Sequence, residues 1–127
     1  MLSFNLKGGT KLRSKSNFIG LTPLCPAKDE AVAIAFYVNK LGFKDNGYGG
    51  VRRGEIEILF YQTDDKQLAE WTSFRIEVED IGSLYEEYTL QEVIHPNGSL
   101  TKKPWGLLEF SIIDLNGVCI TFFEKEA

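Results

Sequence analysis

The sequence is poor in the residues that build disulfide frameworks and metal centres, with two cysteines and one histidine among 127 residues. Cys25 and Cys119 both lie inside apolar stretches, where a buried free thiol is the ordinary state. We therefore expect no disulfide framework. Because disulfide-poor proteins are typical of reducing compartments, we expect a cytoplasmic location.

Long hydrophobic runs are missing as well. No apolar stretch approaches the roughly 20 residues of a membrane span, so we expect a protein with no membrane partner. The first residues carry cations but no apolar stretch followed by a small-residue cleavage site, so we expect no signal peptide. No serine, histidine and aspartate form a recognisable nucleophile arrangement, and no glycine-rich loop has the P-loop or dinucleotide form.

The charge is unevenly distributed along the chain, whose formal net charge is −4. Residues 1–17 contain Lys7, Lys11, Arg13 and Lys15 but no acid, which leaves 10 of the 14 basic residues against all 18 acidic residues in the remainder. We predict a flexible basic arm over residues 1–17 and a single acidic domain over residues 18–127. Such a domain repels phosphate backbones, so we expect no nucleic-acid partner.

The first half of that domain reads as one strand, one helix and three further strands. A strand is predicted over 18–25, and a helix begins behind Asp29 and ends at Gly42. The helical stripe that we expect to be buried consists of Ala31, Ile34, Ala35, Val38 and Leu41. Two short strands follow around 46–53, and a strong strand covers 55–61.

The second half repeats this order after a polar linker over 62–70. A strand over 72–78 precedes a helix that Asp80 can cap and whose buried stripe is Ile81, Leu84, Tyr85 and Tyr88. A short strand begins at Val93, and the strands 107–113 and 118–124 flank a hairpin turn. We therefore predict an α+β fold of two βαβββ modules, over about 18–63 and 71–127, that form a curved, cup-like mixed sheet.

Each predicted strand has one apolar face and one mixed face, because side chains alternate along a strand. The mixed faces carry Glu55, Glu57, Leu59 and Tyr61, then Ser73, Arg75 and Glu77, then Leu107, Glu109, Ser111 and Ile113, and finally Cys119, Thr121 and Phe123. We interpret them as the wall of a cup, the alternative being an ordinary solvated sheet face. Its carboxylates outnumber Arg75, and we expect them to raise one another's pKa and to favour a cationic guest. We expect Arg75 to pair with one glutamate, which makes the net field weaker than the count of carboxylates suggests.

Trp105 is the aromatic residue best placed to contact a ligand. It stands between Pro104, which fixes the chain's approach, and Gly106, which leaves room for the ring. A tryptophan in such a loop can stack on a planar, cationic heteroaromatic group, the alternative being a packing role. The predicted ligand-binding residues are Trp105, Glu57, Tyr61, Ser73, Arg75, Glu77, Glu109, Ser111, Thr121 and Phe123.

Several stretches resemble the glyoxalase/bleomycin-resistance/dioxygenase superfamily, also called the vicinal-oxygen-chelate superfamily. They are residues 27–29, 35–37, 41–43, 53–55, 103–106, 109–110 and 114–117. Lys103-Pro104-Trp105-Gly106 is the most specific of these stretches and resembles bleomycin-resistance proteins. This resemblance implies a homodimer whose pockets form between modules and hold a bleomycin-like ligand without transforming it.

Enzymes of this superfamily hold a divalent metal through histidine and glutamate on four strands. By register, the four positions fall near Thr22, at Leu59 or Glu57, near Ser73 and at Thr121. Only Glu57 could be a ligand, and one carboxylate without imidazole partners makes a poor transition-metal site. We therefore predict no catalytic residue, no metal and no cofactor.

The sole histidine, His95, lies beside Pro96 in a predicted turn, away from those four positions. For Glu124, on the last strand, we expect a structural role. The predicted function is metal-independent sequestration of a cationic planar ligand in an acidic, aromatic pocket. The alternatives are a metal-dependent lyase or dioxygenase, and a small-molecule sensor.

Overall fold

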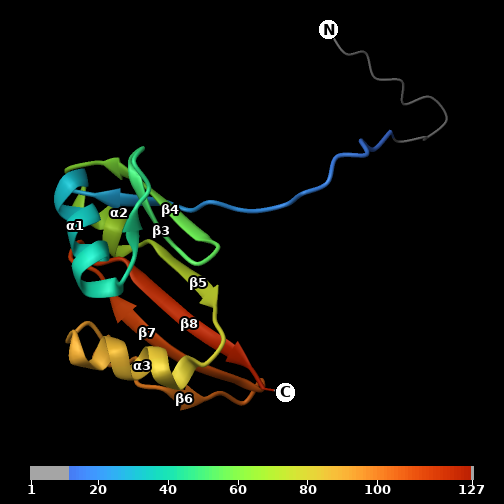
Figure 1. Ribbon diagram of the computed structural model, residues 1–127, viewed down its shortest axis with the longest axis vertical. Helices are drawn as coiled ribbons and strands as arrows, with labels where there is room; N and C mark the ends of the chain where they lie inside the picture. The colour runs from blue at the N-terminus through green and yellow to red at the C-terminus, as the bar shows by residue number, and fades with distance from the viewer. Residues whose placement is uncertain (1–11, 127) are drawn as a thin grey trace, which may run out of the picture.

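The computed structural model describes residues 12–126, which form an α+β protein of two consecutive modules (Figure 1). The first module contains β1 (Leu24–Ala27), α1 (Glu30–Leu41), β2 (Lys44–Asp45), β3 (Gly50–Arg53) and β4 (Ile56–Gln62). The short helix α2 (Lys66–Glu70) leads to the second module. This module contains β5 (Ser73–Glu77), α3 (Ile81–Leu90), β6 (Thr101–Lys102), β7 (Leu107–Ile113) and β8 (Cys119–Lys125). The predicted order of strand, helix and three strands is confirmed in both halves.

Each module builds its own four-stranded mixed sheet, with the orders β1-β4-β3-β2 and β5-β8-β7-β6. The first and last strands of each module pair in parallel, and the other neighbours are antiparallel. The two sheets therefore have the same topology, as expected of a repeated module.

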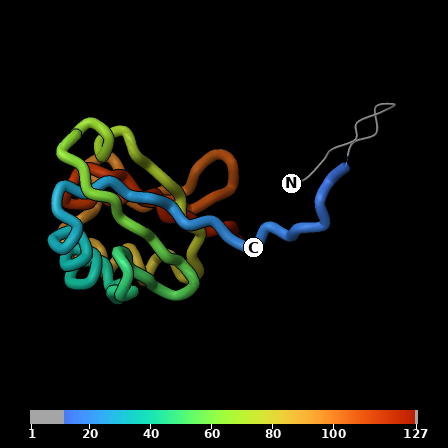
Figure 2. Tube along the Cα trace, turned by 90° about the horizontal axis from the view of Figure 1, so that it is seen from above, coloured from blue at the N-terminus to red at the C-terminus, as the bar shows by residue number. Residues whose placement is uncertain are grey.

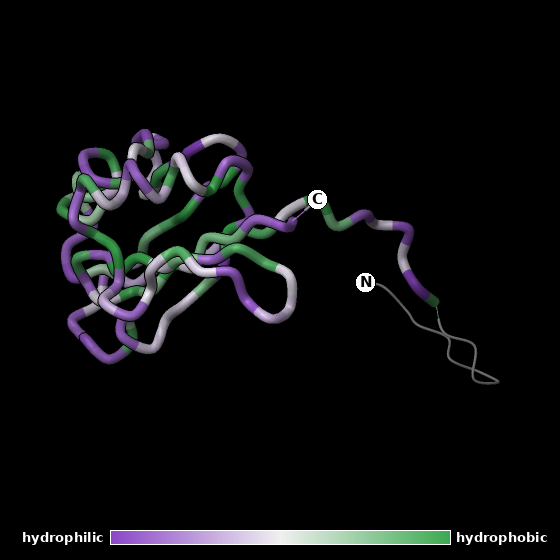
Figure 3. Tube along the Cα trace, turned by 90° about the horizontal axis from the view of Figure 1, so that it is seen from below, coloured by the Kyte–Doolittle hydropathy of each residue, from purple (hydrophilic) through white to green (hydrophobic). Residues whose placement is uncertain are grey.

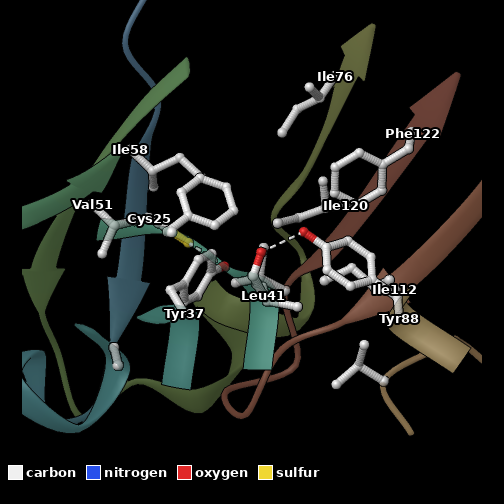
Figure 4. Close-up of a cluster of buried hydrophobic side chains, with 14 of the residues drawn as sticks. Cys25, Tyr37, Leu41, Val51, Ile58, Ile76, Tyr88, Ile112, Ile120 and Phe122 are labelled. Atoms are coloured by element: carbon white, nitrogen blue, oxygen red, sulfur yellow. Dashed lines mark hydrogen bonds between the residues drawn. The ribbon is translucent and has the colours of Figure 1, made fainter. Parts of the chain in front are cut away.

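The strand faces predicted to be apolar are buried, and those of both sheets share one core. Ile58, Ile112 and Ile120 have no exposed surface, and the rings of Phe110 and Phe122 stack on each other beneath α3. Figure 4 shows this cluster, to which both modules contribute.

The ends of α1 are as predicted, but its buried face is not. The Asp29 carboxylate accepts the N–H of Val32 at 3.1 Å, and Gly42 ends the helix with a φ of 74°. The predicted stripe of Ala31, Ile34, Ala35, Val38 and Leu41 is wrong except at Leu41 and the half-buried Ile34, because Ala33 and Tyr37 take the inner positions. A tyrosine ring buries more apolar area than alanine or valine, provided that its hydroxyl finds a partner.

The buried stripe of α3 is confirmed, but the cap predicted for this helix is wrong. The Asp80 side chain makes no capping hydrogen bond, and its backbone is left-handed with a φ of 57°. The carboxylate of Glu124 instead accepts the N–H groups of Asp80 and Ile81, at 3.0 and 3.1 Å. A carboxylate there satisfies free N–H groups and interacts favourably with the helix dipole. This contact confirms the structural role expected for Glu124.

Two tyrosines connect the modules across their boundary, which we call the module seam. Tyr37 lies eight residues after Asp29, and Tyr88 lies eight residues after Asp80. The Tyr37 hydroxyl donates to Asp114 of the second module at 2.7 Å. The Tyr88 hydroxyl donates to the Leu41 carbonyl of the first module at 2.7 Å, as Figure 4 shows. Tyrosines at equivalent positions of the two helices thus make polar contacts across the seam, one to a carboxylate and one to a backbone carbonyl.

The N-terminal part of the domain differs from the prediction. The strand expected over 18–25 begins only at Leu24, and residues 12–23 form no helix or strand. They leave the body as an extended arm (Figures 1 and 2), which Figure 3 shows to be partly hydrophobic. Phe18, Ile19 and Leu21 are 99, 96 and 95% exposed. Most of the predicted basic arm, residues 1–11, lies outside the described residues.

Two smaller elements were also missed or misplaced. The polar linker predicted over 62–70 contains the short helix α2, whose first turn is capped by the Asp65 carboxylate. The strand expected at Val93 is reduced to a single bridge between Ile94 and Ile112, and β6 forms at 101–102 instead. Within residues 12–126, no helix is long and apolar enough to cross a membrane.

Candidate functional site

The second sheet gathers most of the predicted ligand-binding residues on its face opposite α3. The register places Arg75, Thr121 and Ser111 in one row across β5, β8 and β7. The next row contains Glu77, Phe123 and Glu109. Ser73 lies on the same face beside Cys119. We call this surface the open sheet face.

An ion pair lies at the centre of the open sheet face. Two guanidinium nitrogens of Arg75 donate to the Glu109 carboxylate at 2.7 and 3.4 Å, and the guanidinium lies 4.7 Å from the centre of the Phe123 ring. The hydrogen bond from Arg75 lowers the pKa of Glu109 below its usual value. The expectation that clustered carboxylates raise one another's pKa is therefore wrong at Glu109, because its neighbour is a cation.

Trp105 is fixed beside this ion pair. Its indole N–H donates to Glu109 at 2.8 Å, while the residue stays 64% exposed. The following residue, Gly106, has a φ of 84°, a conformation that favours glycine. The ring is thus held in place by its edge and leaves a broad apolar surface free for stacking.

The first module contains an equivalent ring that the sequence analysis missed. Tyr48 lies between β2 and β3, as Trp105 lies between β6 and β7, and it is 65% exposed. Its hydroxyl donates to the carboxylate of Glu57, which also accepts the side-chain N–H of Asn46 at 3.2 Å. These hydrogen bonds, above all that from Tyr48, lower the pKa of Glu57, again opposite to the expectation. A comparison of the two repeats could have found Tyr48, because both rings occupy the loop between the second and third strands.

The remaining predicted residues have simpler surroundings. The hydroxyls of Ser111 and Thr121 lie 2.8 Å apart and satisfy each other. Glu77 lies 3.8 Å from the ammonium of Lys125, and Tyr61 is 39% exposed at the end of β4. Two cavities, of about 540 and 360 Å³, lie along the module seam, and Trp105, Tyr48 and Arg75 line neither. In the single chain, the predicted cup is therefore an open surface at these residues.

The positions at which the superfamily would hold a metal do not fit one here. Thr22 precedes β1, and Thr121 is paired with Ser111 through its hydroxyl. His95 Nδ1 accepts the backbone N–H of Asn97 at 3.0 Å, so this histidine is a turn residue, as expected. Within residues 12–126, no three side chains of histidine, cysteine, aspartate or glutamate converge as metal ligands would.

The cysteines are free, as predicted. Cys25 is fully buried beside Tyr37 and Asp114, and burial raises the pKa of its thiol to about 12. Because the thiolate is the reactive form, Cys25 is a packing residue rather than a nucleophile. Cys119 lies half-buried on the open sheet face.

Sequence comparison finds relatives that are bleomycin resistance proteins. Those of Geobacillus stearothermophilus and Staphylococcus aureus are each 29% identical to this chain over 124 residues, spanning 81% of this chain and 94% of each relative. No family model matches the sequence.

Solved structures give the same result. The bleomycin-binding protein of Streptomyces verticillus, complexed with copper(II)-bleomycin, is 31% identical, with a TM-score of 0.74 over 87% of this chain and 99% of that one. A bleomycin resistance determinant encoded on the transposon Tn5 shares the fold at 22% identity, with a TM-score of 0.69. On this similarity of sequence and structure, the chain belongs to the bleomycin-resistance/glyoxalase fold family.

Proposed function

We propose that this protein sequesters a planar, cationic small molecule of the bleomycin type, without transforming it, between two copies of the chain. The observation that carries the proposal is the pair of exposed rings, Trp105 and Tyr48, each anchored to a carboxylate on the sheet beneath it. An anchored ring loses little conformational freedom when a guest stacks on it, so more of the stacking energy becomes affinity.

The preference for a cation comes from the rings more than from free carboxylates. Glu109 is paired with Arg75, and Glu57 has Arg52 at 3.9 Å, so neither acid presents a full charge to a guest. The N–H of Trp105 and the O–H of Tyr48 donate to anions, which increases the electron density of the rings. Electron-rich ring faces attract cationic heteroaromatic groups, at about 0.5–2 kcal/mol for each contact.

The homodimer is supported by surfaces that one chain leaves uncovered. Trp105 and Tyr48 line neither seam cavity, so a second copy facing them would enclose a guest between the subunits. Phe18, Ile19 and Leu21 are almost completely exposed on the extended arm. Burying three such side chains against a second copy would contribute several kcal/mol, at about 1.5–3 kcal/mol each.

Tryptophan fluorescence tests the binding site directly, because the chain contains only Trp71 and Trp105. We expect bleomycin to quench the fluorescence of the wild type and of Trp71→Ala, in which Trp105 is the only reporter. Trp105→Ala should raise the dissociation constant for bleomycin, measured by calorimetry, by about ten-fold or more. Trp71→Ala is the matched control, because Trp71 is also largely exposed, at 75%, but has no carboxylate partner among the described residues.

Two results would contradict the proposal. Bleomycin binding with equal affinity to Trp105→Ala and to the wild type would show that the anchored ring is not the site. Sedimentation of the ligand-bound wild type as a monomer would show that no second copy of the chain encloses the ligand.

A further inference from the structure

The larger seam cavity, of about 540 Å³, shares only Glu77 with the open sheet face. It lies between the β3–β4 turn of the first module and the end of β5 and start of α3 in the second. Its volume falls within the range of about 300–1,000 Å³ that is usual for small-molecule sites.

The inner wall of this cavity is apolar. Phe43 and Ile56 come from the first module, and Leu84 and Phe122 come from the second. Ile56 and Leu84 are only partly buried, so they retain surface that a guest could cover. An apolar chain entering here would gain about 25 cal/mol for each Å² of apolar surface removed from water.

The rim of the cavity carries a strong excess of negative charge. It contains one guanidinium and five carboxylates, those of Glu55, Glu77, Glu79, Asp80 and Glu87. The guanidinium, Arg53, is already bound by two hydrogen bonds to Glu87 at 2.8 and 2.9 Å. Lys125 lies 3.8 Å from Glu77, which leaves three carboxylates without an ion pair among the described residues.

The second seam cavity shows that this charge is not imposed by the fold. It occupies the equivalent place in the repeat, between the end of β1 and the β7–β8 turn. Its two carboxylates, Asp64 and Asp65, are matched by two ammonium groups, Lys28 and Lys66, and Ala69 of α2 forms part of its wall. The same location therefore has balanced charge in one repeat and a large negative excess in the other.

We propose that the larger cavity is a second ligand site, which takes an organic cation with an apolar chain. The chain lies against Ile56 and Leu84, and the cationic group lies among Glu55, Glu79 and Asp80. Neither Trp105 nor Tyr48 takes part, so this site and the sequestration site can be tested independently.

The probe for the test is n-octylammonium chloride, followed by ¹H–¹⁵N chemical shifts of the full chain at low salt. We expect shifts around Gly54, Glu79 and Ser83, weaker binding as ionic strength rises, and no localised shifts with octanoate. Glu79→Gln should raise the dissociation constant for octylammonium by about two- to five-fold, which is the usual effect of one exposed ion pair. Glu86→Gln removes an equal charge from the same helix but not from the cavity, and it should leave binding unchanged.

A blocking variant completes the test. Ser83 is exposed on α3 and lines the cavity, so Ser83→Phe should fold normally and abolish the octylammonium shifts. Shifts that centre on Ser111 and Trp105, equal binding of octanoate, or unchanged binding in Glu79→Gln and Ser83→Phe would each overturn the proposal. Loss of this proposal leaves the proposed bleomycin site standing, because that site is tested with a different ligand and with variants of Trp105 and Trp71.

Discussion

Removal of the Tyr37 hydroxyl tests how strongly the module seam is held together. Tyr37 is completely buried, and its hydroxyl donates at 2.7 Å to Oδ2 of Asp114, which is only 6% exposed. A hydrogen bond to a charged group contributes about 1.5–3 kcal/mol. We expect Tyr37→Phe to lower the free energy of unfolding at pH 7 by about 2–3 kcal/mol, measured by urea denaturation.

Two other tyrosines provide matched controls. Tyr88→Phe removes the bond donated to the neutral Leu41 carbonyl and a longer one accepted from Arg53 at 3.2 Å, and it should cost about 1–2 kcal/mol. The hydroxyl of the partly buried Tyr85 makes no hydrogen bond within the described residues, so Tyr85→Phe should be close to neutral. A double-mutant cycle of Tyr37→Phe with Asp114→Asn should give a coupling energy of about 1–2 kcal/mol, because the two residues are in direct contact.

The stability cost of Tyr37→Phe should also depend on pH, in a direction that the pKa of Asp114 determines. Burial raises the pKa of Asp114, so its ionised form is disfavoured in the folded state, and the hydroxyl of Tyr37 opposes that shift. Because the pKa of Asp114 is higher in the folded than in the unfolded chain, this carboxyl stabilises the fold at pH values below its unfolded pKa of about 3.9. That contribution is lost as the pH rises through the folded pKa. Tyr37→Phe removes the hydrogen bond that opposes this shift, so the folded pKa of Asp114 rises further in the variant. The variant therefore gains more stability than the wild type as the pH falls, and the penalty of Tyr37→Phe should shrink on acidification. A penalty equal to that of Tyr85→Phe, or one that grows towards pH 4, would refute the reasoning.

Two further stability predictions concern other carboxylates. The pKa of Glu109 is lowered, chiefly by Arg75, so Glu109→Gln should cost about 1 kcal/mol at pH 7, and this difference should disappear as the pH falls through the folded pKa. A constant difference between pH 7 and pH 3 in urea titrations would count against it. Glu124→Gln should lower the free energy of unfolding by about 1 kcal/mol by weakening the start of α3, whereas Glu86→Gln, on the exposed face of that helix, should not. Equal effects of the two variants would show that the α3 terminus does not depend on Glu124.

The repeated architecture could be predicted because its signals are local. Asp29 and Gly42 delimit α1 within a dozen residues, and alternation along each strand sorts the faces correctly. The register then follows, since a one-residue slip would place Ile112 and Ile120 on the outer face.

The features that the sequence could not predict depend on partners far along the chain. The inner face of α1 is decided by Asp114, 77 residues after Tyr37. The start of α3 is capped by a carboxylate 44 residues after Asp80. The expected pairing of Arg75 with one glutamate is confirmed, but its position near the strand's own acids does not indicate that the partner is Glu109, 34 residues away.

The different surroundings of the two thiols have a practical consequence. Cys25 is fully buried and the pKa of its thiol is about 12, so it should not react with alkylating reagents at neutral pH while the protein is folded. Cys119 is paired in register with Ser73 and Ile113 and is partly accessible. A maleimide dye would thus attach at one position without any engineered cysteine. Its emission would report from the surface where sequestration is proposed.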